Sequence, residues 1–451
     1  MNIIIVGCGR VGQTLAEKLN GDGNDVTVID ISEDKVNAIA GKYDLMGIVG
    51  NGATHTVLRE AGIVDADLFI AVTNSDELNL LCCMIAKKEG NCQTIARVKS
   101  PEYSQETDYL KNELGLAMVI NPEYAAAEEI ARVLRFPSAI KVEPFAKGNV
   151  ELIKFKLPAD SQLIGLSVRE MATKFPADLL VCTIERGDEA YIANGDFVFR
   201  EKDVVSIIAS VKSANDFFVK IRRKGHSIKN ALIVGGGVIT HYLCGILENS
   251  GMNLKVVEKN RKVCEELAAR WQKCCVIHGD VSERDLLIEE GIEKTEAFVA
   301  LSDLDEENIL LSLFAKEVGC PKLITKIKHT EYAGVINRLE LDSAICPKNA
   351  TADIIVRYVR AMSNTQGSNM ETLYNVIQDK VEAAEFIVRE NSPITGIPLS
   401  KLKFKPNVLI ASIFRDGKVI VPRGNDVIQT GDAVVIVTTH RGLQDVTDVL
   451  R

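Results

Sequence analysis

Two glycine-rich segments of the sequence have the residue types and spacing that could hold a diphosphate. The first follows the short apolar run Asn2–Val6 and consists of Gly7, Cys8, Gly9, Arg10, Val11 and Gly12. Gly7 permits a tight turn, Gly9 lets the backbone approach a pyrophosphate, and Gly12 lets a helix pack closely on the strand. Free N–H groups at the start of that helix would face the phosphate, and the helix dipole favours its negative charge. The segment therefore predicts a dinucleotide-binding corner.

An acidic residue at the end of the next apolar run supplies the second part of this chemistry. Asp30 ends the run Asp25–Asp30, 23 residues after Gly7. A carboxylate at this place can accept hydrogen bonds from ribose hydroxyls. It would repel a 2′-phosphate, and Ile31 and Ser32 supply no compensating cation. The pattern therefore favours NAD or an unmodified adenine nucleotide over NADP.

The same chemistry recurs later in the chain in a modified form. The second segment follows the run Ala231–Val234 and consists of Gly235, Gly236, Gly237, Val238, Ile239 and Thr240, with Glu258 as the ribose acid. Thr240 replaces the third glycine, so we expect the helix to stand slightly farther from the strand. Val238 replaces Arg10 and removes one cation near the phosphates. We expect nucleotide binding here too; the alternative is a Rossmann unit kept only for packing.

Several further residues are candidates for the two binding sites. Arg10 could fold back onto a phosphate or reach a neighbouring subunit; the alternative is a surface arginine. Arg97 ends a later strand, where α/β folds bind ligands, and Thr73 with Asn74 follows the apolar strand Leu68–Val72. The alternatives are a salt-bridged strand end and a helix-capping turn. The remaining candidates are Asn51, Gly52, Gly279, Asp280, Leu301, Ser302 and Lys326.

These elements belong to an internal duplication. The two glycine segments and the two acids, Asp30 and Glu258, are each separated by 228 residues. A repeat at such a period indicates a duplicated structural unit. Further matching pairs are Gly50–Gly52 with Gly279–Val281, Leu58–Ile63 with Leu287–Ile292, Asp76–Leu81 with Asp305–Leu310, Ala96–Lys99 with Thr325–Lys328, and Glu102–Tyr103 with Glu331–Tyr332.

Each half carries a second, smaller part. Short strands around a small helix are predicted, with the apolar runs Leu163–Val168, Leu180–Ile184 and Val204–Ile208 in one half and Pro393–Leu399, Val408–Ile413 and Val434–Val437 in the other. Asp203 and Asp432 mark equivalent turns. The predicted fold class is α/β, a tandem duplication of a Rossmann-like doubly wound parallel sheet domain plus a small α+β domain.

The predicted domain boundaries follow from this order. The Rossmann-like domains span 1–122 and 226–348, and the small domains span 141–225 and 371–451. Helical segments at Pro122–Phe136 and about Ala350–Ala361 connect them in the regions 123–140 and 349–370. The stretch Ser363–Asn369 is polar and reads as a flexible linker.

Composition restricts the function classes. The 451 residues carry a net charge of −9, which argues against non-specific nucleic-acid binding. No apolar run approaches the length of a membrane span and no secretory signal is evident, so we expect a cytoplasmic protein. The 11 cysteines sit mostly in apolar contexts and are expected to be reduced, and the six histidines are scattered, so no metal site is predicted.

The sequence offers no recognisable catalytic machinery. It has no Tyr-x-x-x-Lys motif, no nucleophile elbow and no metal cluster, and the partner of each Rossmann unit is a small domain rather than a substrate domain. We therefore expect a nucleotide sensor and not an enzyme. The alternative is an NAD-dependent oxidoreductase.

The glycine segment with Asp30, Gly50–Thr54, Ala71–Asn74 and Ala96–Val98 resembles the RCK (also called KTN) N-terminal domain. The segments of about 150–212 and 381–440 resemble RCK C-terminal domains. Two tandem copies are similar to the regulatory subunits of Trk-type potassium uptake systems.

This resemblance implies binding of NAD(H) and of ATP or ADP. It implies a homo-oligomeric ring, expected to be a tetramer, on the cytoplasmic face of a TrkH/TrkG-type potassium channel, peripheral to the inner face of the cell membrane. By the same resemblance, Pro122–Phe136 matches an intersubunit crossover helix and Arg10 matches an arginine that contacts nucleotide phosphates. The alternative within the family is a regulator of potassium efflux.

Overall fold

The computed structural model describes residues 1–104, 106–221, 228–329, 338–363, 370–377, 380–390, 392–440, 443 and 445–451. The chain divides into two compact units, Met1–Ala131 with Lys229–Val356 and Arg132–Ile228 with Arg357–Arg451. The predicted pair member Glu331–Tyr332, most of the polar stretch 363–369 and the predicted boundary at 225 lie outside the described residues. Within the described ranges, no helix has both the length and the apolar character needed to cross a bilayer.

The first unit begins with a six-stranded parallel sheet. Its strands are β1 (Asn2–Val6), β2 (Asp25–Asp30), β3 (Met46–Val49), β4 (Leu68–Ala71), β5 (Gln93–Arg97) and β6 (Met118–Ile120), in the order β3-β2-β1-β4-β5-β6. Unbroken apolar runs such as Leu68–Ala71 are buried on both faces, as a central parallel strand requires. The strand order reverses between β1 and β4, and ligands of doubly wound sheets bind at that point. The predicted Rossmann-like sheet is confirmed.

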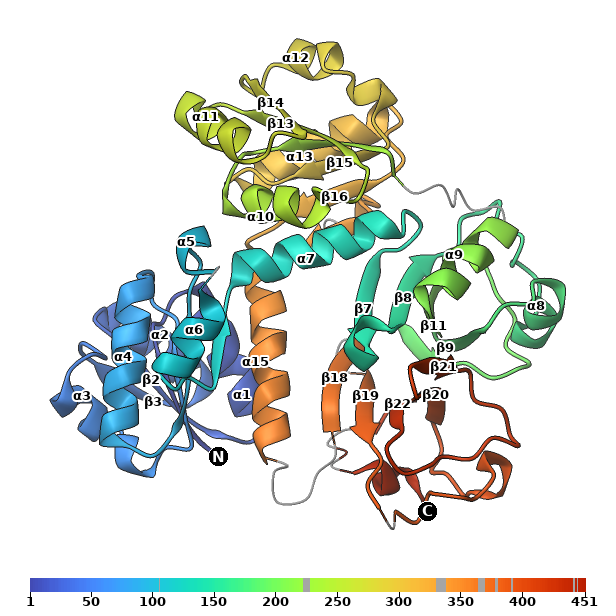
Figure 1. Cartoon of the computed structure of the whole chain (residues 1–451), viewed down its shortest axis with the longest axis horizontal. Helices are drawn as coiled ribbons and strands as arrows, with labels where there is room; N and C mark the ends of the chain where they lie inside the picture. The colour runs from blue at the N-terminus through green and yellow to red at the C-terminus, as the bar shows by residue number, and fades with distance from the viewer. Residues whose placement is uncertain are drawn as a thin grey trace. The chain divides into compact units, whose positions relative to one another are not determined.

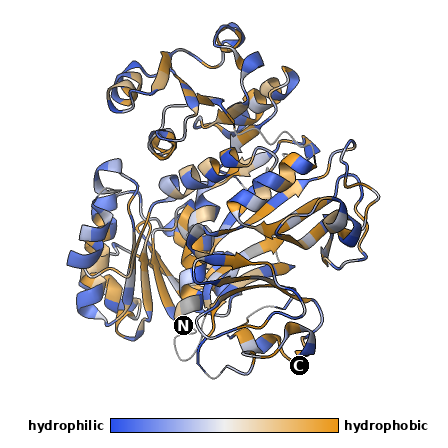
Figure 2. Cartoon of the chain, turned by 45° about the vertical axis from the view of Figure 1, so that its right-hand side comes forward, coloured by the Kyte–Doolittle hydropathy of each residue, from blue (hydrophilic) through white to orange (hydrophobic). Residues whose placement is uncertain are grey.

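In the described part of this half, six helices follow the strands of this sheet along the chain (Figure 1). They are α1 (Arg10–Gly21), α2 (Glu33–Tyr43), α3 (His55–Glu60), α4 (Asp76–Glu89), α5 (Pro101–Ser104) and α6 (Thr107–Glu113). In α1 the buried residues Gly12, Leu15, Ala16 and Leu19 recur at helical spacing and form one apolar face. Figure 2 shows the same pattern in colour, with hydrophobic strands and hydrophilic outer helix faces.

The second half of this unit repeats the architecture. Strands β12 (Asn230–Val234), β13 (Asn253–Glu258), β14 (Cys274–His278), β15 (Ala297–Ala300), β16 (Leu323–Lys326) and β17 (Ser343–Ile345) have the order β14-β13-β12-β15-β16-β17. The helices are α10 (Val238–Leu247), α11 (Arg261–Arg270), α12 (Arg284–Glu289) and α13 (Asp305–Glu317). The predicted duplication is confirmed by the matching order of all six strands and by the four helices described in this half.

A long helix follows the last strand of each Rossmann sheet. These helices are α7 (Pro122–Arg135) and α15 (Pro347–Ser363), and each begins at a proline, which is favoured at the first helical position. Each helix contacts the opposite half. Tyr124 of α7 packs edge-on against Tyr242 of α10, with 5.4 Å between ring centroids. Lys18 of α1 lies 2.5 Å from the Asp353 carboxylate of α15.

The second unit contains two small antiparallel sheets. Strands β7 (Lys141–Phe145), β8 (Val150–Lys156), β9 (Leu179–Arg186), β10 (Glu189–Ile192) and β11 (Val204–Ala209) have the order β10-β9-β11-β8-β7, with helices α8 (Val168–Lys174) and α9 (Val211–Lys220). Strands β18 (Met370–Ile377), β19 (Val381–Ile387), β20 (Val408–Arg415), β21 (Lys418–Ile420) and β22 (Ala433–Thr438) have the order β18-β19-β22-β20-β21. The two orders are the same topology read from opposite edges.

The predicted runs Leu163–Val168 and Pro393–Leu399 are not strands. They form turns with single bridges, such as Ser167 to Val198, and α8 already begins at Val168. Gly165 and Gly396 have φ values of +82° and +71°, which interrupts an extended strand in both runs.

The two small sheets share one apolar core. Residues Phe145, Leu152 and Ile208 from the first sheet pack in one cluster with Val381, Ala383, Val435 and Val437 from the second. The Phe145 and Tyr374 rings meet edge-on at 4.9 Å, and the Ala146 N–H donates to the buried Glu385 carboxylate at 3.0 Å. The small domains therefore stabilise each other by burying a common face.

At the predicted turn acids, each small domain has a buried aspartate that pairs with a partly exposed arginine. Asp203 is completely buried and accepts two hydrogen bonds from Arg186 at 2.8 Å, together with the Arg200 N–H at 2.8 Å. Asp432 repeats the arrangement with Arg415 at 2.7 and 2.6 Å. Such bidentate pairs combine charge with fixed geometry.

Glu151 in β8 gives the second unit a predicted pH dependence. Its side chain is 2% exposed, and burial raises its pKa to about 7, against the lowering effects of Arg135 and Arg132 and with a raising contribution from Glu143. The folded chain therefore holds this proton more tightly than the unfolded chain, so stability is lost as pH rises from about 4.5 through 7. In Glu151→Gln, the free energy of unfolding that is lost over this pH range should be smaller by up to about 3 kcal/mol.

Urea unfolding of the wild type and the variant at pH 5.5 and 8.0 measures this loss. If the free energy of unfolding falls equally in both proteins between the two pH values, the prediction is wrong.

Candidate nucleotide-binding site

The first glycine corner has the geometry that the sequence predicts. Gly7 has a φ of +106°, and a Cβ there would lie 2.9 Å from the Val72 carbonyl. A Cβ at Gly12 would lie 1.9 Å from the Gly7 carbonyl oxygen, so only glycine lets α1 pack this closely on β1. A Cβ at Gly9 would meet no atom within 4 Å. The middle glycine therefore faces open space, where a phosphate can approach the backbone.

Each acid is tied to its own glycine loop. One Asp30 oxygen accepts the Cys8 N–H at 2.7 Å and the other accepts the Ser32 N–H at 2.9 Å. Glu258 does the same with the Gly236 and Asn260 N–H groups, both at 2.6 Å. A carboxylate has about four acceptor positions, so sugar hydroxyls can still bind both acids. The acids thus fix the loop as well as offering a ribose contact.

The second corner accommodates Thr240 by a local hydrogen bond. Its hydroxyl donates to the Gly235 carbonyl at 2.5 Å, and the residue is fully buried. A Cβ at the equivalent Gly12 of the first corner would lie 1.9 Å from the Gly7 carbonyl oxygen. The larger separation of α10 from its strand stays a prediction. Gly235 keeps the positive φ of the turn, at +95°.

A buried asparagine in each half fixes the loop that follows the fourth strand. Asn79 accepts the Thr73 N–H at 2.7 Å and donates to the Arg97 carbonyl at 2.9 Å. Asn308 accepts the Ser302 N–H at 2.8 Å and donates to the Lys326 carbonyl at 3.0 Å. These two residues join the ends of neighbouring strands at the site. The sequence analysis did not assign them, although both lie in the repeated segments Asp76–Leu81 and Asp305–Leu310.

Arg97 is largely engaged by the protein itself. Its guanidinium donates to the Thr73 carbonyl at 3.3 Å and lies 3.6 Å from the Glu123 carboxylate at the start of α7. The side chain is 13% exposed. The arrangement agrees with the salt-bridged strand end that was the alternative reading, while the residue still lines the cleft described below.

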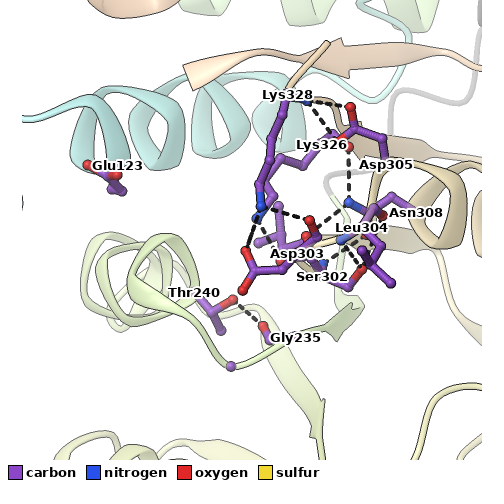
Figure 3. A network of polar contacts seen from close by, with 12 residues as sticks. Glu123, Gly235, Thr240, Ser302, Asp303, Leu304, Asp305, Asn308, Lys326 and Lys328 are labelled. Atoms are coloured by element: carbon purple, nitrogen blue, oxygen red, sulfur yellow. Dashed lines mark hydrogen bonds and ion pairs between the residues drawn. The ribbon is translucent and has the colours of Figure 1, made fainter. Parts of the chain in front are cut away.

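Two lysines supply the cations of the second corner (Figure 3). Lys326 donates to the Leu301 carbonyl at 3.1 Å and lies 3.6 Å from the Asp303 carboxylate, and Lys328 binds the same carboxylate at 3.0 Å. Burial lowers the pKa of Lys326, and the hydrogen bond from Lys328 lowers the pKa of Asp303. Asp303 takes the position that Asn74 has in the first half. In the second half the positive charge comes from Lys326 at the end of β16 and from Lys328 just after it. In the first half it comes from Arg10 at the start of α1.

Both corners open onto one cleft of about 930 Å³. Arg10 is exposed at the first position of α1 and contributes to the wall. The sequence-predicted residues that line the cleft are Cys8, Gly9, Arg10, Val11, Asn74, Arg97, Gly235, Gly237, Val238, Ile239, Glu258, Leu301, Ser302 and Lys326. Lining residues that the sequence analysis did not assign include Gln13, Lys35, Glu123, Asp303, Lys328 and Lys348.

Nine other predicted residues do not line the cleft. Those not among the lining residues are Gly7, Gly12, Asp30, Asn51, Gly52, Thr73, Gly236, Gly279 and Asp280. Asn51 accepts the Ala53 N–H at 2.9 Å within its own turn. Asp280 lies 2.6 Å from Lys259, whose hydrogen bond lowers the pKa of Asp280.

The arrangement offers hydrogen-bond donors, acids and lysines for an adenine nucleotide. Among the residues that the structure describes, no cluster of His, Cys, Asp and Glu could hold a metal ion. The Cys8 thiol in the first loop is buried, and burial raises its pKa to about 12, so it is not a nucleophile at neutral pH. What these corners can do chemically is bind and orient an anionic ligand.

Comparison with known proteins places both halves in described domain families. Residues 3–122 and 231–347 match the TrkA-N domain, and residues 152–222 and 383–451 match the TrkA-C domain. The chain is 32% identical to the Trk system potassium uptake protein TrkA homolog 1 of Methanosarcina mazei, over 97% of both chains. It is 32% identical to the Trk system potassium uptake protein TrkA of Halomonas elongata, over 99% of this chain and 98% of the relative.

The solved structure of the GsuK channel bound to NAD has the same fold. It superposes with a TM-score of 0.65 at 15% identity, over 98% of this chain and 77% of that one.

Proposed function

The chain belongs to the TrkA family of Trk-system potassium uptake proteins, and we propose that it regulates potassium uptake by sensing adenine nucleotides at its two glycine corners. The observation that supports this most directly is the open approach at Gly9 beside an acid-clamped loop. Backbone N–H groups at a helix start bind phosphate, and the acid binds the sugar. The second half repeats both features, with the open glycine at Gly237 and the loop held by Glu258.

The ligands we propose are NAD(H) and ATP or ADP. The acids Asp30 and Glu258 favour a free ribose over a 2′-phosphate. Nicotinamide chemistry would be supplied by NAD(H) when bound, but the residues facing the cleft serve to hold and orient it. The cleft is walled by two glycine corners, which suits a sensor better than an oxidoreductase with a separate substrate domain.

The proposed partner is a TrkH/TrkG-type membrane subunit. We place the chain at the inner face of the cell membrane as a homo-oligomeric ring, with a tetramer as the expected form. Closed symmetric assembly is the usual form of soluble homo-oligomers. Helix α7 is the proposed crossover element between subunits. Regulation of potassium efflux is the second candidate, because the same domains could gate either direction.

A ligand can shift the ring from one state to another only if it binds one state more tightly than the other. ATP and ADP differ by one phosphate, and a cation that reaches only the third phosphate would distinguish them. Arg10 is the best candidate, because it is exposed on the cleft at the start of α1. A coupling free energy of about 1–3 kcal/mol would be normal for such a system.

Removing the acids tests the two binding sites separately. Asp30→Ala and Glu258→Ala should each weaken nucleotide binding at their own corner by about tenfold or more, since hydrogen bonds to charged groups are worth about 1.5–3 kcal/mol. Calorimetric titration with NADH, ATP and ADP measures this, with NADPH as the poorly bound control. Thermal melting checks that each variant is folded. Unchanged affinities in both variants would refute nucleotide sensing at these corners.

Arg10→Ala tests how the chain distinguishes ATP from ADP. The variant should bind ADP nearly as the wild type does and lose most of its preference for ATP, about fivefold or more at a coupling of 1 kcal/mol. Small-angle scattering with each nucleotide follows the conformational change. Arg59→Ala, an exposed arginine on α3, is the matched control. If ATP still drives the same change with unchanged affinity, Arg10 does not have this role.

Growth of a potassium-uptake-deficient strain at low potassium, with and without this chain, separates uptake from efflux. Uptake predicts growth only when the chain and its membrane partner are both present. An efflux regulator would give no rescue.

A further inference from the structure

Two cysteines of the second Rossmann domain lie within reach of each other. The Sγ atoms of Cys244, on the buried face of α10, and Cys274, at the start of β14, are 3.8 Å apart. Cys244 is 2% exposed and Cys274 is half-buried. The next residue, Cys275, is exposed. The pair therefore joins a buried cysteine to a half-buried one.

A glycine and a tryptophan create this close approach. A Cβ at Gly245 would lie 2.8 Å from the Trp271 ring, so any larger residue would push α10 away from the segment before β14. The Trp271 indole N–H donates to His241 at 3.4 Å, and the Trp271 carbonyl accepts the Cys274 N–H at 3.0 Å. Helix α10 and the start of β14 are thus held together by contacts on both sides of the sulfur pair.

The two sulfurs have different acidities. The Cys244 S–H group donates to the Cys274 sulfur, which lowers the pKa of Cys274 and raises the pKa of Cys244. A thiolate is the reactive form of cysteine, and a neighbouring thiol can resolve its oxidised product. Cys274 is therefore the attacking group and Cys244 the resolving group.

We propose that Cys244 and Cys274 form a redox site at which a hydroperoxide closes an intramolecular disulfide. The Cys274 thiol first loses its proton to solvent, the thiolate attacks one oxygen of hydrogen peroxide, the O–O bond breaks to give the sulfenic acid, and the released hydroxide takes up that solvent proton as water. The Cys244 sulfur then attacks the sulfenic acid sulfur, and the second hydroxide leaves with the Cys244 proton as water. Two thiols are oxidised and one peroxide is reduced to two waters.

The disulfide would act on the second corner. Helix α10 begins at Val238 directly after the glycine loop, and β14 pairs with β13, which ends at Glu258. A covalent link between α10 and β14 fixes the helix relative to the strand that carries the sugar acid. The equivalent positions of the first half are Ala16 and Leu45, so the first corner lacks this control.

Peptide mapping of the full-length chain tests the proposal. The native protein is treated with hydrogen peroxide, the remaining thiols are alkylated, and the peptides are analysed by mass spectrometry with and without dithiothreitol. We expect loss of alkylation at Cys244 and Cys274 together, a crosslinked peptide pair, and full recovery with dithiothreitol. The buried Cys82 and Cys83 of α4 serve as internal controls and should stay reduced.

Two variants make the result decisive. In Cys244→Ala, Cys274 should accumulate sulfenic and higher acids because its resolving thiol is missing. In Cys275→Ala, the crosslink should form as in the wild type. Cys244 and Cys274 remaining alkylatable after peroxide treatment would overturn the proposal, as would a crosslink that requires Cys275 or joins two chains.

Discussion

Gly12→Ala is expected to disrupt the first Rossmann domain. The new Cβ would lie 1.9 Å from the Gly7 carbonyl oxygen, and backbone cannot yield as a flexible side chain can. Helix α1 must move away from β1, at a cost of about 3 kcal/mol as an overpacked contact. The glycine loop moves with the helix, so nucleotide binding at this corner should be lost as well. Urea unfolding and calorimetric titration of the full chain measure the two effects.

Gly9→Ala is the matched control for this change. It lies in the same loop and adds the same methyl group, but that group meets no atom within 4 Å. Its free energy of unfolding should stay within about 0.5 kcal/mol of the wild type, whereas phosphate approach at the loop is obstructed. Loss of binding without loss of stability is the expected signature. Equal stability of Gly12→Ala and the wild type would show that the close helix contact is unnecessary.

Asp203→Ala is expected to destabilise the second unit by about 2–3 kcal/mol, because Arg186, whose side chain is 27% exposed, loses its charge-assisted hydrogen bonds to the buried carboxylate. Asp203 is completely buried, and the Nε and Nη2 atoms of Arg186 each donate a hydrogen bond to it at 2.8 Å. The Arg200 N–H also loses its acceptor. Thermal and urea unfolding, followed by circular dichroism, measure the change.

Asp196→Ala provides the surface control. Asp196 pairs with Arg169 at 3.1 Å, but the two side chains are 86% and 74% exposed. Exposed ion pairs contribute about 0–1 kcal/mol, so this variant should unfold almost as the wild type does. Asp432→Ala should resemble Asp203→Ala, because Arg415 repeats the arrangement. If Asp203→Ala and Asp196→Ala unfold alike, the pair of Asp203 and Arg186 does not stabilise this domain.

The Rossmann sheets were predictable because their signals are local and occur twice. An unbroken apolar run, a glycine turn and a terminal acid define β1, α1 and β2, and the same series defines β12, α10 and β13. The small domains were less predictable. Strands β7 and β8 carry charged residues such as Lys141, which pairs with Glu143 of its own strand, and Glu151, which is buried near Arg132 and Arg135, and these charges interrupt the apolar pattern of a strand.

The site was predicted where it depends on short segments and missed where it depends on contacts between distant ones. The roles of Gly7, Gly9 and Gly12 follow from spacing alone. Asn79 and Asn308 looked like polar helix residues, because only the fold brings them between the ends of neighbouring strands. Asp303 and Lys328 were missed for the same reason, since their pairing joins loops after β15 and β16.

The shared cleft makes the two proposed ligand sites neighbours. Two anionic nucleotides bound at both corners at once would repel each other through this space. By thermodynamic reciprocity, the factor by which one bound ligand changes the affinity for the other is the same in both directions. On the proposed function, a dinucleotide in one corner and ATP or ADP in the other would therefore set the state of the chain together, and neither would set it alone.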